Sequence, residues 1–162
     1  VGSEMCIRDR VNVCDETETL LLGRKIVDVI DFPIIITLVG DLGAGKTTLT
    51  RGMLRQLGYL GHVKSPTFSI VEMYEILSLQ IAHFDMYRIT DEQELEFFGF
   101  KEYFDTVDLI VIEWPNRISG LDFSIDIEIT ITIKNNSRDL ILKSRSDRGS
   151  LVLKKLKSKI LR

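Results

Sequence analysis

Short apolar runs alternate along the chain with longer segments in which apolar residues recur every three or four positions. Residues 15–30 and 47–57 show this helical spacing, and Gly58 marks the end of the second segment. Residues 34–39 (IIITLV) and 109–112 (LIVI) are continuous apolar runs, which is typical of strands covered on both faces in a parallel sheet. The pattern therefore predicts an α/β fold with buried parallel strands.

Other segments alternate apolar and polar residues one by one, as strands with one solvent-facing side do. Residues 68–76 and 79–84 flank a short break and predict a β-hairpin. Residues 124–133 alternate almost without interruption, and residues 140–142 are expected to pair with them. From these patterns we predict a three-layer sandwich in which antiparallel strands are added to a mostly parallel central sheet.

Signals for short helices lie between the hairpin and the second apolar run. Thr90 with Gln93 resembles a capping box that opens a helix over residues 91–98, and a further helix is expected over residues 101–104. The basic tail, residues 154–162, has the spacing of an amphipathic helix. Its cations either face solvent or contact RNA or a partner.

Composition narrows the classes of function that the chain can have. Its 162 residues, 44% of them hydrophobic, suffice for one domain with a single core. The net charge of −3 provides no general positive field, so a contact with RNA would be local or made through a partner. Two cysteines and two histidines do not supply the ligand pattern of a structural zinc site. No apolar run is long enough to cross a bilayer, and we expect a cytoplasmic protein.

Residues 1–10 (VGSEMCIRDR) show neither apolar periodicity nor a clear link to the rest of the chain. They resemble a translated adaptor sequence, and a disordered natural terminus is the competing interpretation. We therefore treat residues 1–10 as a non-native or disordered leader and residues 11–162 as a single domain.

The segment with the most specific chemistry is Gly40–Thr47 (GDLGAGKT), which matches G-x-x-x-x-G-K-[ST] at every defined position. It follows a predicted buried strand and begins a predicted helix, as a phosphate-binding loop requires. A glycine turn that merely joins a strand to a helix is the alternative. The complete motif in this context favours binding of Mg-ATP.

The residue type at each defined position of this P-loop has a chemical function. Gly43, Ala44 and Gly45 would bring backbone N–H groups to the phosphates, and the two glycines tolerate positive φ. Lys46, exposed to the ligand, would reach the β- and γ-phosphates, and the hydroxyl of Thr47 would ligate Mg²⁺.

Phosphoryl transfer also needs a carboxylate near the metal, and two predicted strands end in one. Glu113 follows residues 109–112 directly, and Asp85 follows the second strand of the hairpin. Either would hold Mg²⁺, directly or through water, or orient the attacking water. Parallel strands gather their C-terminal ends at a ligand crevice, which favours these functions over surface positions.

Thr67 and Trp114 are two further candidate site residues, and each is open to two interpretations. Thr67, in a loop after Pro66, is either a γ-phosphate contact like that of a switch threonine or part of a plain turn. Trp114 follows Glu113 and either packs in the core or covers a nucleotide or partner surface.

With these pieces in place, the chain resembles the TsaE (YjeE) family, the ATPase component of bacterial threonylcarbamoyladenosine synthesis on tRNA. The resemblance extends from about Asp15 to Leu156. The segments that carry it are GDLGAGKTTLTRG at 40–52, VKSPTFSIVEMY at 63–74, HFDMYRI at 83–89, ELEFFGF at 94–100 and IEWPNRI at 112–118.

The resemblance implies a single P-loop domain that hydrolyses ATP slowly by itself and works with the TsaD and TsaB proteins. TsaD transfers a threonylcarbamoyl group to an adenosine next to the anticodon, so this chain would meet tRNA only indirectly. Lys46, Thr47 and Thr48 would bind phosphate and metal. Glu113 would assist Mg²⁺, and Asp85 would be needed for hydrolysis.

The resemblance also assigns a nucleotide contact to Asp15, which precedes the first predicted helix. The sequence departs from the family at Phe68, where Tyr is common, and at Met86, where Leu is common. Both changes keep the shape of the side chain.

Three other functions compete with this one. A small-molecule or nucleoside kinase would add an arginine-bearing lid, but Arg88 and Arg117 stand isolated in the chain. A GTP switch protein would carry an Asn-Lys-x-Asp segment, which is absent from the sequence. A non-catalytic interaction module would not need the intact P-loop and both carboxylates.

Overall fold

The computed structural model describes residues 8–120 and 123–160 of the chain. Among these residues, seven strands form one sheet in the order β1-β7-β6-β2-β5-β4-β3. The strands are β1 (Arg8–Val13), β2 (Ile34–Val39), β3 (Val71–Ile76), β4 (Leu79–Asp85), β5 (Leu109–Glu113), β6 (Ile127–Lys134) and β7 (Ser137–Ser144). The helices are α1 (Glu16–Asp28), α2 (Lys46–Leu57), α3 (Glu94–Phe97), α4 (Tyr103–Thr106) and α5 (Asp147–Ile160), with 3-10 helices η1 (Phe100–Glu102) and η2 (Pro115–Ile118).

The centre of the sheet is parallel and its edges are antiparallel. Strands β6, β2, β5 and β4 run in the same direction, with the two continuous apolar runs, β2 and β5, side by side. The pairings β1–β7, β3–β4 and β6–β7 are antiparallel. The sheet is therefore mixed and partly, not mostly, parallel, and the predicted addition of antiparallel strands to a parallel centre is confirmed. Each predicted hairpin adds an antiparallel strand, and β1 pairs with the outer side of β7.

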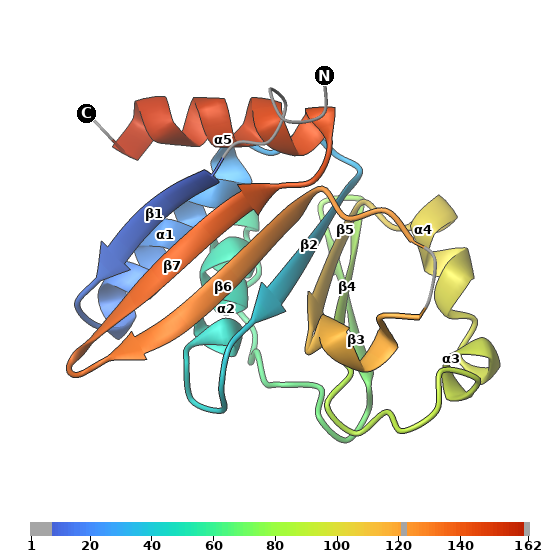
Figure 1. Cartoon of the computed structure of the whole chain (residues 1–162). Helices are drawn as coiled ribbons and strands as arrows, with labels where there is room; N and C mark the ends of the chain where they lie inside the picture. The colour runs from blue at the N-terminus through green and yellow to red at the C-terminus, as the bar shows by residue number, and fades with distance from the viewer. Residues whose placement is uncertain (1–7, 121–122, 161–162) are drawn as a thin grey trace.

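The two faces of the sheet are covered differently. In Figure 1, α1 and α2 lie behind the sheet and α5 runs along its top. The buried side chains of these three helices form an aliphatic cluster with the sheet, which we call the rear cluster. On the opposite face, α3, η1 and α4 cover β4 and β5 through an aromatic cluster around Phe84 and Phe100, the front cluster. In the described residues no helix covers the front of β1, β7 and β6, so the third layer of the predicted sandwich is partial (Figure 1).

Several local predictions change in the structure. The predicted helix 91–98 is reduced to α3, because residues 91–93 form a turn in which the Asp91 side chain accepts from the backbone N–H of Gln93. Thr90 donates its hydroxyl hydrogen bond to Glu94, 2.9 Å away, so the expected capping box with Gln93 is not formed.

Strand β1 was not predicted from the sequence. It begins at Arg8, so residues 8–10 of the segment that we set aside as a leader pair with β7, from Arg8 opposite Lys143 to Arg10 opposite Ile141. The remainder of that segment, residues 1–7, lies outside the described residues.

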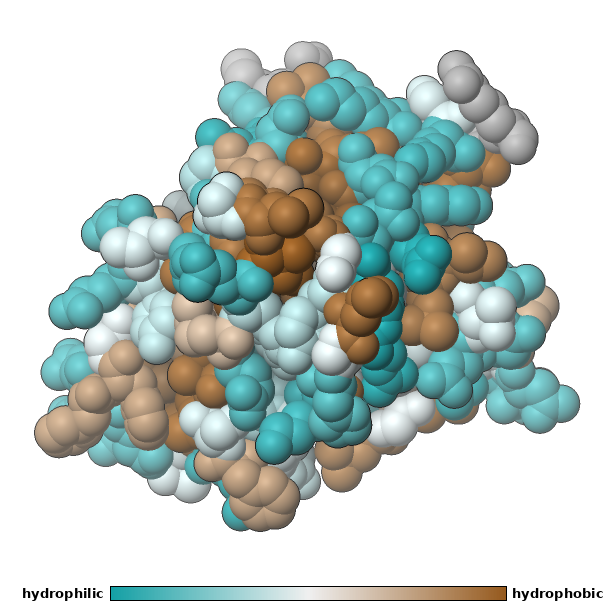
Figure 2. Space-filling model, turned by 180° about the vertical axis from the view of Figure 1, so that it is seen from behind, coloured by the Kyte–Doolittle hydropathy of each residue, from teal (hydrophilic) through white to brown (hydrophobic). Residues whose placement is uncertain are grey.

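Seen from behind, the surface mixes polar and apolar side chains, with one hydrophobic patch in a hollow near the middle of this face (Figure 2). In the part of the chain that the structure describes, no helix combines the length and the apolar character needed to span a bilayer.

Candidate functional site

The glycine-rich segment turns tightly between the end of β2 and the start of α2. Gly43 and Gly45 have φ angles of 80° and 112°, and Gly45 is the N-cap of α2. A Cβ atom on Gly40 would lie 2.8 Å from the carbonyl oxygen of Ile131, so a larger residue would not fit there. A Cβ atom on Gly43 would meet nothing within 4 Å, which shows that this side of the loop is open. The loop can therefore present N–H groups and the positive end of α2 to an anion.

The loop lines a cavity of about 470 Å³, which we call the first cavity. Almost all of the predicted site residues line it: Gly43, Ala44, Gly45, Lys46, Thr47, Thr48, Thr67, Asp85, Glu113 and Trp114. The parallel register sets Asp85 beside Glu113 on neighbouring strands. The cavity thus lies at the C-terminal ends of parallel strands, where ligands bind in α/β sheets.

Lys46 lies back over the loop. The residue is only 5% exposed to solvent, but it lines the first cavity, where we expected it to be exposed to the ligand. The ammonium donates hydrogen bonds to the carbonyl oxygens of Gly40 and, at 3.1 Å, Asp41. It also lies 4.3 Å from the centroid of the Trp114 ring. Burial lowers the pKa of Lys46, although nearby carboxylates oppose this shift. The ammonium of Lys46 is therefore desolvated and hydrogen-bonded only to neutral carbonyl oxygens among the described residues, so an anion in the cavity could pair with it.

Asp85 is buried and holds the loop before β3. Its Oδ2 accepts hydrogen bonds from the hydroxyls of Ser65 at 2.8 Å and Thr67 at 3.1 Å. Its Oδ1 accepts from the backbone N–H of Tyr87 at 2.9 Å. Thr67 lies in the turn formed by residues 67–69, and its hydroxyl is also tied to a carboxylate at the wall of the first cavity.

Glu113 is also buried, and its partner is a histidine. The Nε2 atom of His83 lies 2.7 Å from Oε2 of Glu113, and His83 is completely buried. The carbonyl oxygen of Glu113 accepts a hydrogen bond from the backbone N–H of Met86 at 3.0 Å. Both the side chain and the backbone of Glu113 are thus connected to β4 and the residue after it.

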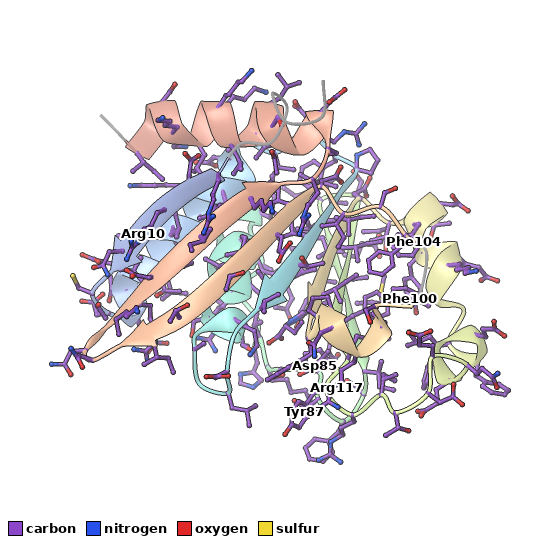
Figure 3. The ribbon with its side chains drawn as sticks, viewed as in Figure 1. Arg10, Asp85, Tyr87, Phe100, Phe104 and Arg117 are labelled. Atoms are coloured by element: carbon purple, nitrogen blue, oxygen red, sulfur yellow. The ribbon has the colours of Figure 1, made fainter. Side chains whose placement is uncertain are left out.

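Trp114 lies at the wall of the first cavity and also packs against the front cluster. Its backbone is left-handed, with φ 57° and ψ 50°, which is uncommon for a bulky residue. Its ring lies 4.9 Å from that of Tyr87, and the guanidinium of Arg117 lies 5.4 Å from the Tyr87 ring. In Figure 3, Asp85, Tyr87 and Arg117 gather below the sheet, at the edge where β2 ends.

Asp15 is the predicted site residue that does not line the first cavity. It caps α1 by accepting a hydrogen bond from the backbone N–H of Glu18 at 2.9 Å. It lines a second cavity of about 340 Å³ together with Thr48, Arg51 and Arg138. Gly43, Ala44, Gly45 and Thr48 line both cavities, so the P-loop lies between them.

The sequence did not identify several residues that complete the site. His83, Ser65 and Tyr87 were overlooked as site residues, although each belongs to a segment that carries the resemblance. Position in a family motif was the available signal for them. Arg138 donates to the carbonyl oxygen of Ala44 at 3.2 Å, and no pattern around it pointed to the loop.

The residues present suit a nucleotide phosphate and magnesium. The open side of the loop at Gly43 leaves room for an anion, and Lys46 supplies a cation. Thr47 and Glu113 offer the hard oxygen atoms that Mg²⁺ prefers. In the described part of the chain, no group of three or more His, Cys, Asp or Glu side chains is arranged to hold a metal ion.

Comparisons with known proteins agree on one family. The family model described as "Threonylcarbamoyl adenosine biosynthesis protein TsaE" matches residues 13–141. A Haemophilus influenzae protein named tRNA threonylcarbamoyladenosine biosynthesis protein TsaE is 40% identical over 144 residues, covering 86% of this chain and 91% of that protein. A Bacillus subtilis protein of the same name is 44% identical over 84 residues, 52% of each chain. The crystal structure of Bacillus subtilis YdiB has a TM-score of 0.81 and 25% identity, covering 96% of this chain and 97% of that one. The chain therefore belongs to the TsaE family of threonylcarbamoyl adenosine biosynthesis proteins.

Proposed function

We propose that the chain is a Mg-dependent P-loop ATPase that supports threonylcarbamoyladenosine modification of tRNA together with the TsaD and TsaB proteins. The observation that supports an ATPase is the convergence of the loop, Lys46 and two strand-end carboxylates on one cavity. Family membership supports the connection to tRNA modification.

In this proposal the P-loop binds the phosphates of ATP. Backbone N–H groups around Gly43 and Gly45 and the ammonium of Lys46 would bind phosphate oxygens, and the hydroxyl of Thr47 would ligate the metal. Magnesium, when bound, neutralises charge on the phosphate that is transferred. We expect it to arrive with the nucleotide, because Mg²⁺ usually takes one or two protein ligands beside phosphate oxygens and water.

Asp85 and Glu113 have different hydrogen-bond partners, which supports different functions for the two carboxylates. Both oxygens of Asp85 accept hydrogen bonds from the loop that carries Thr67 or from Tyr87. In Glu113, Oε2 is held by His83, and Oε1 has no hydrogen-bond partner among the described residues. We therefore assign the metal to Glu113, and the positioning of Thr67 and of the attacking water to Asp85.

The second cavity is suited to the nucleoside part of ATP. It shares the P-loop with the first cavity and adds Asp15 from the start of α1 and Arg138 from β7. A nucleotide whose phosphates occupy the first cavity would reach it past Thr48, which lines both. This arrangement supports the nucleotide contact that we expected for Asp15.

Slow turnover by the isolated chain is expected from the residues that line the first cavity. No arginine lines it in the described residues, so the transition-state charge has no arginine finger. Arg88 and Arg117 instead lie against the rings of Phe68 and Tyr87. We expect the TsaB–TsaD pair to accelerate hydrolysis, by supplying a cation or by ordering those that are present.

The proposal is tested by measuring ATP hydrolysis by the purified chain with and without TsaB and TsaD, followed by an assay of tRNA modification. We expect slow Mg-dependent turnover that the pair increases, and modification that requires this chain. Fast turnover by the chain alone would contradict the need for partners. Turnover that depends on a small phosphate acceptor would indicate a kinase, and a preference for GTP over ATP would indicate a switch protein.

A further inference from the structure

The proposed function does not explain why a histidine, His83, is buried beside Glu113. The imidazole lies in the core with none of its surface exposed. Its only hydrogen bond in the described residues joins Nε2 to Oε2 of Glu113, and Nδ1 has no partner there. A buried polar atom without a partner costs about 1–3 kcal/mol. An aliphatic residue would avoid this cost, so the retained hydrogen bond suggests a use at the site.

The geometry indicates which atom donates in this pair. If Nε2 carries the proton, it donates to the carboxylate and Nδ1 is left with an unpaired lone pair. If Nδ1 carried the proton, a buried N–H group would be left without an acceptor, which is rarer than an unpaired acceptor. His83 is therefore the donor, in its Nε2–H tautomer.

We propose that His83 is a positioning residue that fixes the carboxylate of Glu113 through Nε2 and leaves Oε1 for the ligand in the first cavity. A glutamate side chain otherwise rotates freely at its last bond. The backbone of Glu113 is already held by Met86, so the imidazole restrains the remaining freedom. Mutating a residue that hydrogen-bonds to a metal ligand typically lowers metal affinity or activity by about 10–100-fold.

A matched pair of variants tests the position of the donor. In His83→Gln the amide nitrogen is as many bonds from Cβ as Nε2 is, so it can replace the donor to Glu113. In His83→Asn the amide nitrogen falls where Nδ1 lies and cannot reach. Both variants bury one amide group. A difference in kcat between them therefore reports on the hydrogen bond to Glu113. Circular dichroism and thermal unfolding show whether each variant is folded.

The first measurement concerns the reaction and rests on the proposed function. We expect His83→Asn to lower kcat by about 10–100-fold and to raise the Mg²⁺ concentration needed for half-maximal rate, with KM for ATP within about twofold. His83→Gln should retain most of kcat. Equal kcat values for folded His83→Asn and wild type, or an equal loss in both variants, would overturn the proposal.

The second measurement needs no ATP and separates the two proposals. Nitrogen-15 NMR of the nucleotide-free wild type should show His83 protonated at Nε2 and bare at Nδ1, with the Nε2 signal shifting in Glu113→Gln. A proton on Nδ1, or an Nε2 signal that does not shift in Glu113→Gln, would overturn the role of His83. If the wild type shows this tautomer but hydrolyses no ATP, the proposed function fails and the hydrogen bond to Glu113 stands. If His83→Asn does not fold, the NMR result and the kcat of His83→Gln decide.

Discussion

The rear and the front of the sheet support the same cavity in different ways. At the rear, α2 buries Leu49, Met53 and Leu54 completely in an aliphatic cluster and carries the P-loop at its N-terminus. At the front, short helices are held by edge-to-face rings, as between Phe84 and Phe100 at 5.1 Å. The front cluster supports the segments that follow Asp85 and Glu113. From the proposed function we therefore expect nucleotide binding to depend on the rear of the sheet and hydrolysis on the front.

The largest effects on stability are expected from truncating each cluster. Met53→Ala should lower the free energy of unfolding by about 2–5 kcal/mol, and Phe100→Ala by about 3–5 kcal/mol. The front should open locally, because its short helices depend on ring contacts. Hydrogen exchange should show faster exchange across α3, η1 and α4 in Phe100→Ala while β2 and α2 stay protected. Uniform loss of protection in both variants would remove the distinction between the two faces.

The next largest effect is expected at the P-loop. Lys46→Ala should weaken ATP binding by roughly 100-fold or more, because a desolvated cation is lost from the phosphate site. The fold should survive, since the ammonium of Lys46 bonds to loop carbonyls and lies over the Trp114 ring, and Lys46 belongs to neither hydrophobic cluster of the described residues. Calorimetry measures the affinity and thermal unfolding the stability, with exposed Lys64→Ala as the control. An unfolded variant would show that Lys46 belongs to the structural core.

Hydrolysis should be affected separately from binding at Glu113. Glu113→Gln removes the charge and should lower Mg-dependent kcat by about 10–100-fold while ATP affinity changes by less than about threefold. Exposed Glu75→Gln, on β3, is the control. Turnover that is unchanged in the presence of TsaB and TsaD would exclude Glu113 as the metal ligand.

A smaller effect is expected where Asp85 holds the loop. Ser65→Ala removes one of two hydroxyls that donate to Oδ2 of Asp85. The loss of one such hydrogen bond is worth about 1 kcal/mol, so kcat should fall about fivefold and ATP affinity should hardly change. A double variant with Thr67→Ala should lose more than the sum of the two single effects, because it leaves Oδ2 without a donor. Additive losses would argue against a shared role.

The smallest effect concerns the uncovered front of β1 and β7. Hydrogen bonds from Asn12 and Arg10 lower the pKa of Asp139 below its ordinary value of 3.8. A lowered carboxyl pKa stabilises the fold above pH 3.8, and this contribution is lost as the pH falls through the lowered value. Asp139→Asn should therefore reduce stability slightly at pH 7 and not at all at strongly acid pH. Urea unfolding at both pH values tests this, with exposed Asp105→Asn as the control.

The sequence predicted the rear of the molecule better than the front. Strands β2 and β5 and helix α2 appear where apolar runs and periodicity indicate, because these patterns are local. The predicted length of α3 was wrong, because the Asp91 side chain forms a turn where the first helical residues were expected. Ring contacts such as Phe84 with Phe100 could not be predicted there either, since they join residues that no local pattern connects. Strand β1 was missed because RDRVNV is polar and forms a strand only through pairing with β7.

The same distinction holds within the candidate site. The P-loop was visible because its residues are contiguous. That Asp85 and Glu113 lie side by side was expected from the ends of two parallel strands. The partners of these carboxylates, Ser65 and His83, were not predictable from local patterns, because they depend on the register of β4 against β5 and on the path of a loop.

The most direct test of this account is a calorimetric titration of Mg-ATP into the folded chain and into its Lys46→Ala variant. We predict binding at one site in the wild type, weakened roughly 100-fold in the variant. If the folded wild type gives no heat of binding for ATP or ADP, even with TsaB and TsaD present, the first cavity is not a nucleotide site and the account is contradicted.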